Sequence, residues 1–172
     1  IAKVVQDFRT ILPEAKIYVY DNSSSDDTEN QAKNAGAIVR KEPLKGKGNV
    51  VRRMFADISS DIYLMVDGDG TYDAKAAPEM VRLLEEHDLD MVAGVRVTDK
   101  STEKEAYRPL HQLGNRFFNF MVRKLFGGKF TDIFTGYRVF SRRFVKSFPA
   151  LSCGFEIETE FTVHALELKI PF

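Results

Sequence analysis

The feature that most restricts the fold is a run of five consecutive apolar residues at 62–66 (IYLMV), which ends abruptly at Asp67. A strand that is apolar at every position, and not only at alternate positions, has to be covered on both faces of its sheet. Such cover is typical of proteins in which helices pack on both sides of a mostly parallel sheet. The run therefore predicts a central strand in an α/β layer structure.

Short apolar strands and amphipathic helices alternate along the rest of the chain. Because successive strands are joined through helices, this order favours parallel neighbours. The 172 residues, of which 44% are hydrophobic, are enough for one core, so we expect a single domain over 1–172. The expected strands are 16–20, 37–40, 62–66, 91–95 and 137–140, and the expected helices are 1–12, 27–35, 50–58, 77–84, 110–125 and 157–166.

The cysteine content and the hydropathy exclude two classes of protein. With a single cysteine, Cys153, the chain has no internal disulfide framework and no thiolate zinc site, and we expect this cysteine to be a small buried apolar residue. No stretch approaches the roughly 18 to 20 consecutive apolar residues that a membrane-spanning helix needs. We therefore expect a domain that folds without disulfides and does not cross a membrane.

Charge is unevenly distributed, although the 25 basic and 25 acidic residues balance. Residues 108–147 contain nine Lys or Arg and one acid, Asp132, and so carry a net charge of +8. Eight of the 14 phenylalanines lie in the same stretch. Aromatic residues among cations suit a partner that bears phosphate and is partly apolar, such as an anionic membrane surface. The same pattern also fits an amphipathic helix and a strand with Phe inward and the cations in solvent.

The sharpest chemical signal is the segment 66–71 (VDGDGT). Asp67 and Asp69 are two residues apart and can place oxygens on one hard divalent ion, which leaves positions for phosphate oxygens and water. Gly68 between them lets the backbone and a ligand approach closely. The alternative is a turn in which the aspartates accept hydrogen bonds from backbone amides.

The same segment resembles the nucleophile motif of haloacid-dehalogenase-like phosphatases, in which the first aspartate is phosphorylated. In that family the motif follows the first strand, and a second acidic pair closes the magnesium site later in the chain. Here the segment follows two strand–helix units, and no G-D-x-x-x-D segment comes later. A phosphatase is therefore the weaker interpretation.

An ordered set of motifs from about residue 18 to residue 171 resembles glycosyltransferase family 2. The set comprises DNSSSDDT after a strand, a KGKG loop, the DGDG segment, D-x-x-T-G-Y-R and GFEIETE. It is most similar to the branch that transfers sugars to polyprenyl phosphates, the branch of dolichyl-phosphate mannose synthase. The resemblance implies a GT-A (Rossmann-like) fold and inverting transfer of a sugar from a nucleotide-diphosphate sugar to a dolichyl or undecaprenyl phosphate. It also implies a peripheral location at the cytosolic face of a membrane and no nucleic-acid partner.

The resemblance implies a donor site at the carboxyl ends of the strands. Asp67 and Asp69 would hold Mg²⁺ or Mn²⁺ at the diphosphate. The implied donor nucleotide-binding residues are Asp21, Asn22, Asp26, Lys45, Lys47, Asp67 and Gly68. The metal and the lysines would offset the charge that builds as the bond between sugar and phosphate breaks. For the KGKG loop, the alternative is an exposed, flexible start of a helix.

The acceptor side centres on Asp132, which is either an ion-pair partner of Arg138 or a site carboxylate. A general base suits a hydroxyl acceptor, whereas a lipid phosphate is already anionic and would need Asp132 only for orientation. Glu158 and Glu160 are implied site residues, although carboxylates are also favoured at the start of a helix by its dipole. The implied phosphate ligands are Arg96, Arg108, Arg116 and Arg138, and the implied catalytic residues are Asp132, Asp69, Glu158 and Glu160.

The sequence departs from the family pattern in three places. The first strand with its P-x-x-N-E loop and the segment after Pro171 are not in the sequence, so we expect a catalytic domain without its first strand and its C-terminal continuation. Thr71 and Tyr72 stand where some relatives have glutamine and histidine. Two other functions remain open, namely a family 2 transferase that acts on a saccharide hydroxyl and a non-catalytic nucleotide or lipid-phosphate binding module. The pattern does not predict the sugar, the nucleobase or the oligomeric state.

Overall fold

The computed structural model describes residues 1–94 and 135–172. The elements in order are α1 (Ala2–Ile11), β1 (Tyr18–Asp21), α2 (Thr28–Asn34), β2 (Ile38–Lys41), α3 (Lys47–Asp57), β3 (Ile62–Met65), the 3-10 helix η1 (Ala74–Ala76), α4 (Ala77–Glu86), β4 (Met91–Ala93), β5 (Arg138–Ser141), α7 (Arg142–Ser147) and α8 (Ile157–Glu167). The predicted alternation of strands and helices is confirmed in these ranges, and the predicted helix at 110–125 lies outside them. Both η1 and α7 are additions that the hydrophobic pattern did not predict.

Hydrogen-bonded strands form two sheets in the described part of the chain. β1 pairs with β2 in parallel, with Tyr18 opposite Ile38. The other sheet has the order β3-β5-β4, and β5 runs antiparallel to both neighbours, so β3 and β4 point the same way. The direction of β5 was not predicted, because the long connection between β4 and β5 is compatible with either direction.

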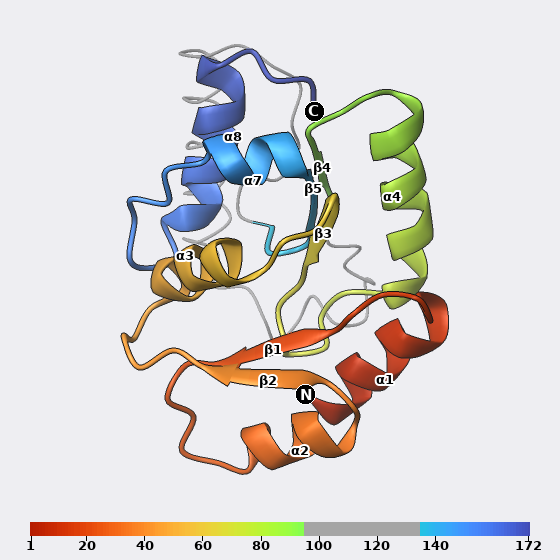
Figure 1. Ribbon diagram of the computed structural model, residues 1–172, viewed down its shortest axis with the longest axis vertical. Helices are drawn as coiled ribbons and strands as arrows, with labels where there is room; N and C mark the ends of the chain where they lie inside the picture. The colour runs from red at the N-terminus through yellow and green to blue at the C-terminus, as the bar shows by residue number, and fades with distance from the viewer. Residues whose placement is uncertain (95–134) are drawn as a thin grey trace, which may run out of the picture.

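Helices lie on both faces of the β3-β5-β4 sheet, with α3, α7 and α8 on one face and α4 on the other (Figure 1). β5 supplies side chains to both cores: Phe140 packs with residues of α3, α7 and α8, and Val139 packs with residues of α1 and α4. Arg138, Val139 and Phe140 are each at most 1% exposed. β5 is therefore buried on both faces. β3 also contributes to both cores, with Tyr63 and Met65 in one and Ile62 and Leu64 in the other, so the predicted cover of the 62–66 run on both faces is confirmed.

The prediction of a central strand at 62–66 is wrong for the described sheet. β3 borders β5 on one side and has no other hydrogen-bonded neighbour among the described strands. Of its residues only Tyr63 is buried, and the others are half-buried. The cause is β5, which enters between β3 and β4 and takes the central place. β3 still ends immediately before the predicted acidic segment.

Two further expectations concern Cys153 and membrane crossing. Cys153 is exposed, in the loop between α7 and α8, so the prediction that it is buried is wrong. The loop passes over the surface and directs its carbonyl groups inward, which leaves the thiol outside. Within 1–94 and 135–172, the structure contains no helix with the length and apolar character needed to span a bilayer.

Candidate functional site

Three charged side chains from distant parts of the sequence meet beyond the carboxyl end of β3. The Lys47 Nζ donates to Asp67 Oδ1 and to Glu158 Oε1, at 2.5 Å each. Lys47 is the first residue of α3, Asp67 follows β3, and Glu158 lies in the first turn of α8. The exposed fractions of the three side chains are 15%, 25% and 8%. We call these residues the ion cluster.

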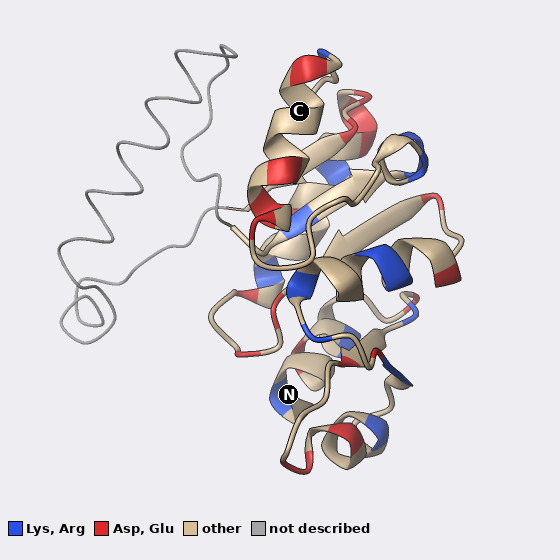
Figure 2. Ribbon diagram, turned by 90° about the vertical axis from the view of Figure 1, so that its left-hand side faces the viewer, with Lys and Arg blue, Asp and Glu red and all other residues tan. Residues whose placement is uncertain are grey.

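The electrostatics of the ion cluster keep Lys47 charged. Burial by itself lowers the pKa of Lys47, but its hydrogen bonds to Asp67 and Glu158 outweigh this effect and raise the pKa above the ordinary value. Burial raises the pKa of Glu158, and the hydrogen bond from Lys47 only partly opposes that shift. The ion cluster is therefore a paired, partly desolvated arrangement, which is the condition under which charges are tolerated away from water. Figure 2 shows acidic segments in α8 and in the loop after β3, with basic segments between them.

The start of β5 places backbone directly against Asp67. A Cβ atom at Gly136 would overlap the Asp67 carboxylate, so no larger residue fits here without displacing that carboxylate. The Gly136 amide donates to Tyr72 Oη at 2.8 Å, and Thr135 Oγ1 donates to the Gly94 carbonyl at 2.6 Å. These bonds fix the segment that touches Asp67.

The KGKG loop leads into α3 beneath the loop that precedes α8. The Gly48 amide donates to the carbonyls of Cys153 at 3.0 Å and Gly154 at 3.1 Å. A Cβ atom at Gly46 or Gly48 would overlap carbonyl groups of that loop, and Gly46 has a φ of +123°. The glycines are thus required by a close approach of backbone. Gly48 is buried and Lys47 is paired, so the alternative of an exposed, flexible helix start is wrong for these two residues. Lys45, by contrast, is exposed.

The predicted nucleotide-binding residues after β1 support two loops. The Asn22 Nδ2 donates to the carbonyls of Glu42 at 2.7 Å and Leu44 at 2.8 Å, and its Oδ1 accepts from the Gly46 amide at 2.8 Å. Asn22 therefore holds the segment that leads into KGKG. Asp21, which is 8% exposed, accepts from the Ser24 amide at 3.1 Å. Contact of either residue with a nucleotide stays a prediction.

Asp26, a predicted nucleotide-binding residue, supports the start of α2. Its Oδ1 accepts from the amide and the hydroxyl of Thr28, at 3.1 and 2.6 Å. These hydrogen bonds lower the pKa of the Asp26 carboxyl. Asp26 thus orders the turn that leads into α2, and its contact with a nucleotide stays a prediction.

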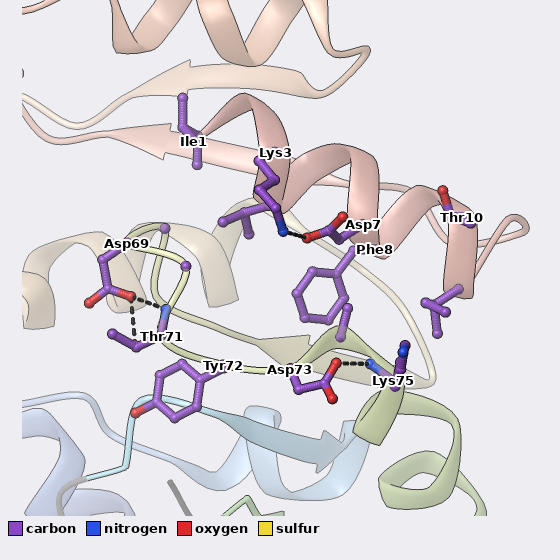
Figure 3. A pocket seen from close by; sticks show the side chains of 15 residues that line it. Ile1, Lys3, Asp7, Phe8, Thr10, Asp69, Thr71, Tyr72, Asp73 and Lys75 are labelled. Atoms are coloured by element: carbon purple, nitrogen blue, oxygen red, sulfur yellow. Dashed lines mark hydrogen bonds and ion pairs between the residues drawn. The ribbon is translucent and has the colours of Figure 1, made fainter. Parts of the chain in front are cut away.

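Asp69 follows Asp67 by two residues and is not one of the three residues of the ion cluster. It is exposed, and its Oδ1 accepts from the amide and the hydroxyl of Thr71, at 3.0 and 2.7 Å. Asp69 and Gly68 line a cavity of about 770 Å³ between the loop 68–75 and α1, where Lys3 and Asp7 form an ion pair (Figure 3). These bonds form the predicted turn, and the role of Asp69 as a metal ligand stays a prediction.

The side chains of Glu160 and Arg138 are both occupied by contacts with the backbone. Both carboxylate oxygens of Glu160 accept backbone amides, from Leu151 and Ser152, at 2.8 Å each. Arg138 is 1% exposed and donates to the carbonyls of Thr135 and Glu158, at 3.1 Å each. A phosphate could reach Arg138 only by displacing such contacts, so its burial speaks against the predicted role in acceptor binding.

The other predicted acceptor-side residues lie outside the described residues. They are Arg96, Arg108, Arg116 and Asp132. Their roles stay predictions.

Three residues of the site region were not predicted as site residues. Gly136 is part of the G-Y-R motif, which indicated the place but not the contact with Asp67. Tyr72 was noted only as a departure from the family pattern. Arg52, which donates to the Ala150 carbonyl, has no sequence signal because it looks like any cation on a helix surface.

Comparisons with known proteins point to one family. A family model described as Glycosyl transferase family 2 matches residues 1–148. Protein RfbJ of Shigella flexneri is 56% identical over 112 residues, which cover 65% of this chain and 85% of that protein. Glycosyltransferase AglJ of Haloferax volcanii is 39% identical over 171 residues, which cover 99% of this chain and 55% of that protein. The chain thus spans about half the length of AglJ.

Solved structures share the fold. Glucosyl-3-phosphoglycerate synthase of Mycobacterium tuberculosis matches with a TM-score of 0.79 and 23% identity, over 98% of this chain and 61% of that chain. A crystal structure of the same synthase with Mn²⁺, UDP-glucose and phosphoglyceric acid matches with a TM-score of 0.75 and 22% identity, over 96% of this chain and 60% of that chain. These neighbours confirm the predicted GT-A fold.

Proposed function

Since the chain belongs to glycosyl transferase family 2 and has the GT-A fold, we propose that it transfers a sugar from a nucleotide-diphosphate sugar to a polyprenyl phosphate. Lys47, Asp67 and Asp69 would hold the donor, and the acceptor would lie at a membrane surface. The observation that carries the donor assignment is the ion cluster, in which a paired ammonium sits beside the acidic end of β3.

The ion cluster supports a role in binding a diphosphate. Lys47 remains a cation, because the hydrogen bonds to Asp67 and Glu158 raise its pKa. A fixed cation at this place would stabilise the negative charge that develops on the departing nucleoside diphosphate. Glu158 would keep Lys47 in place, because it accepts a hydrogen bond from the ammonium. Gly136 would keep Asp67 in place, because it packs against the carboxylate.

The residues after β3 also fit a divalent metal. Asp67 and Asp69 supply carboxylate oxygens, the ligand type that Mg²⁺ and Mn²⁺ prefer, and the exposed Asp69 leaves room for phosphate oxygens and water. Among the described residues no group of three His, Cys, Asp or Glu could hold a metal, so the substrate would complete the shell. The bound ion would act as a Lewis acid toward the diphosphate. Mn²⁺ beside UDP-glucose in the synthase of similar fold agrees with this choice.

The transfer itself is a displacement at the anomeric carbon. An oxygen of the acceptor forms a bond to that carbon while the bond to the diphosphate breaks, and the electron pair leaves with the nucleoside diphosphate. Attack from the opposite face inverts the configuration. A polyprenyl phosphate brings an oxygen that is already anionic, and the +8 charge of residues 108–147 supports an anionic acceptor.

A saccharide hydroxyl is the second candidate acceptor, and Glu158, which lies beside Lys47 in the ion cluster, is one candidate base for it. A hydroxyl must lose a proton, and a carboxylate whose pKa is raised by burial is a better base than an exposed one. Asp132 is the other candidate base. With a lipid phosphate neither residue would have a proton to remove.

An assay of nucleoside diphosphate release tests the proposal. The chain is incubated with UDP-glucose or GDP-mannose and Mn²⁺, with either undecaprenyl phosphate or a saccharide as acceptor, and the products are identified by mass spectrometry. We expect release that depends on the lipid phosphate and is lost in Asp69→Asn. Turnover with the saccharide alone would support the second candidate, and release unchanged in Asp69→Asn would contradict both.

A further inference from the structure

We propose that Arg52 and Glu160 are positioning residues, which fix Lys47 by holding residues 150–154 against the start of α3. We call residues 150–154 the strap. The inference rests on the proposed function, because the position of Lys47 affects nucleotide binding only if Lys47 contacts the donor. It assigns to Glu160 a role different from the catalytic one that the sequence implied.

Arg52 and Glu160 bind the strap through complementary groups. The Arg52 Nε and Nη2 donate to the Ala150 carbonyl at 2.9 and 2.6 Å, and Nη2 also donates to the Leu151 carbonyl at 3.1 Å. The Glu160 carboxylate accepts from the amides of Leu151 and Ser152 at 2.8 Å each. Arg52 thus donates to carbonyl groups, and Glu160 accepts from amide groups, of the same short segment. Both sets of bonds are charge-assisted and therefore strong.

Polar contacts hold the strap more than burial does. Leu151 is 74% exposed and Cys153 is exposed as well, so these side chains add little apolar packing. Ala150 is buried, but its φ of +48° is unfavourable for a residue with a Cβ atom. The bonds from Arg52 to the Ala150 carbonyl help to keep the strap in this conformation.

The strap in turn fixes the backbone on either side of Lys47. The amides of Gly48 and Asn49 donate to the Cys153 carbonyl at 3.0 and 3.3 Å. Gly46 packs so closely on Cys153 that a Cβ atom there would overlap its carbonyl. Lys47 therefore stands between two residues that cannot move away from the strap without breaking these contacts.

The first turn of α8 contacts both Lys47 and the strap. Glu158 accepts from Lys47 and Glu160 accepts from the strap, and both belong to the first turn of α8. Burial favours the neutral form of Glu160, but the hydrogen bonds from Ser152 and Leu151 outweigh it and lower the pKa. Glu160 is thus ionised at neutral pH and holds the strap while Glu158 holds the ammonium.

A double-mutant cycle tests whether Arg52 acts through Lys47. The affinity for UDP or GDP with Mn²⁺, whichever the chain binds, is measured for the wild type, Arg52→Ala, Lys47→Ala and the double variant. We expect Arg52→Ala to weaken binding about tenfold, the size of a lost charge-assisted hydrogen bond. In the Lys47→Ala background the same change should have less than about a twofold effect.

A matched control lies one residue further along α3. Arg53 is exposed and pairs with Asp57 at 2.8 Å, so Arg53→Ala removes a cation from the same helix without touching the strap. We expect the nucleotide affinity of this variant to be unchanged. Glu160→Gln provides a second variant if Arg52→Ala fails to fold, and hydrogen exchange at the Gly48 amide should be faster in both strap variants than in the wild type.

The outcomes separate the two proposals. If the wild type binds no nucleotide, the proposed function fails and the role of the strap fails with it. If the wild type binds and Lys47→Ala weakens binding, but Arg52→Ala has no effect or the same effect in both backgrounds, only the strap proposal is overturned.

Discussion

At the residue scale, the candidate site depends on Lys47, whose ammonium joins two carboxylates. The motifs predicted Lys47, Asp67 and Glu158 as site residues, because their chemistry and order are visible in the sequence. Their contact was not predictable, since 20 residues separate Lys47 from Asp67 and 111 separate it from Glu158. Asn22 was predicted as a nucleotide-binding residue, and in the structure it contacts the KGKG loop. Its side-chain amide holds the backbone of the segment that leads into KGKG.

Gly136→Ala tests the close packing on Asp67. The added methyl group would overlap the Asp67 carboxylate and move it away from Lys47. We expect metal-dependent nucleotide affinity to fall at least about tenfold, the loss expected for one charged hydrogen bond, with the circular dichroism spectrum unchanged. Affinity equal to that of the wild type would show that the position of Asp67 does not matter for the donor.

At the element scale, the hydrophobic pattern predicted most strands and helices, and tertiary pairing decided the rest. The apolar run at 62–66 formed β3 as expected, but β5 took the central place that the run had indicated. The pattern did not predict α7, because it has only six residues and its start depends on a hydrogen bond from the Phe144 amide to the Ser141 side chain. The direction of each strand and the order of the strands in the sheet follow from contacts between distant segments. The spacing of apolar residues along the sequence carries no information on these contacts.

Asp90 links β4, β5 and α7, and its removal tests how they are joined. Asp90 is 2% exposed and accepts from Ser141 Oγ at 2.5 Å and Arg143 Nη2 at 2.6 Å. Burial would raise its pKa, but the hydrogen bonds from Arg143 and Ser141 outweigh this and lower it below the usual 3.8. Because the folded-state pKa is the lower one, ionised Asp90 stabilises the fold above pH 3.8, and this contribution is lost as the pH falls through the folded-state pKa.

We therefore expect Asp90→Asn to lower the free energy of unfolding by about 1 to 2 kcal/mol at pH 7, a modest value because Arg143 is 65% exposed. The difference from the wild type should shrink below pH 3.8, as measured by urea unfolding across this range. Asp61→Asn is the control, because Asp61 is 93% exposed and its pair with Arg142 spans 3.5 Å. An equal loss in both variants, or a difference that does not change with pH, would contradict this account.

At the scale of the whole molecule, the family and the fold were predictable from the order of the motifs, and the comparisons confirm both. The acceptor assignment stays a prediction. Its predicted residues Arg96, Arg108, Arg116 and Asp132 lie outside the described residues, and the fifth, Arg138, is buried. That residues 1–172 form a single domain stays a prediction. So do the peripheral membrane location and the lipid acceptor.

The charge of residues 108–147 allows a test at this scale. If these cations meet a membrane, the chain should bind vesicles that contain anionic lipid, with about 1 kcal/mol for each engaged Lys or Arg at low salt. Raising the ionic strength should weaken this binding steeply, because exposed charges are screened. Cosedimentation at low and high salt measures the effect, with neutral vesicles as the control. Binding that does not depend on salt would place the cations in solvent instead.

The central claim is that the ion cluster and the acidic segment after β3 form a metal-dependent donor site. Calorimetric titration of UDP and GDP into the chain, with and without Mn²⁺, tests it most directly when the Asp67→Asn/Asp69→Asn variant is measured in parallel. We expect one of the two nucleotides to bind the wild type only in the presence of Mn²⁺, and the variant to lose this binding. Equal binding by both proteins, or no binding of either nucleotide by the wild type, would contradict the claim.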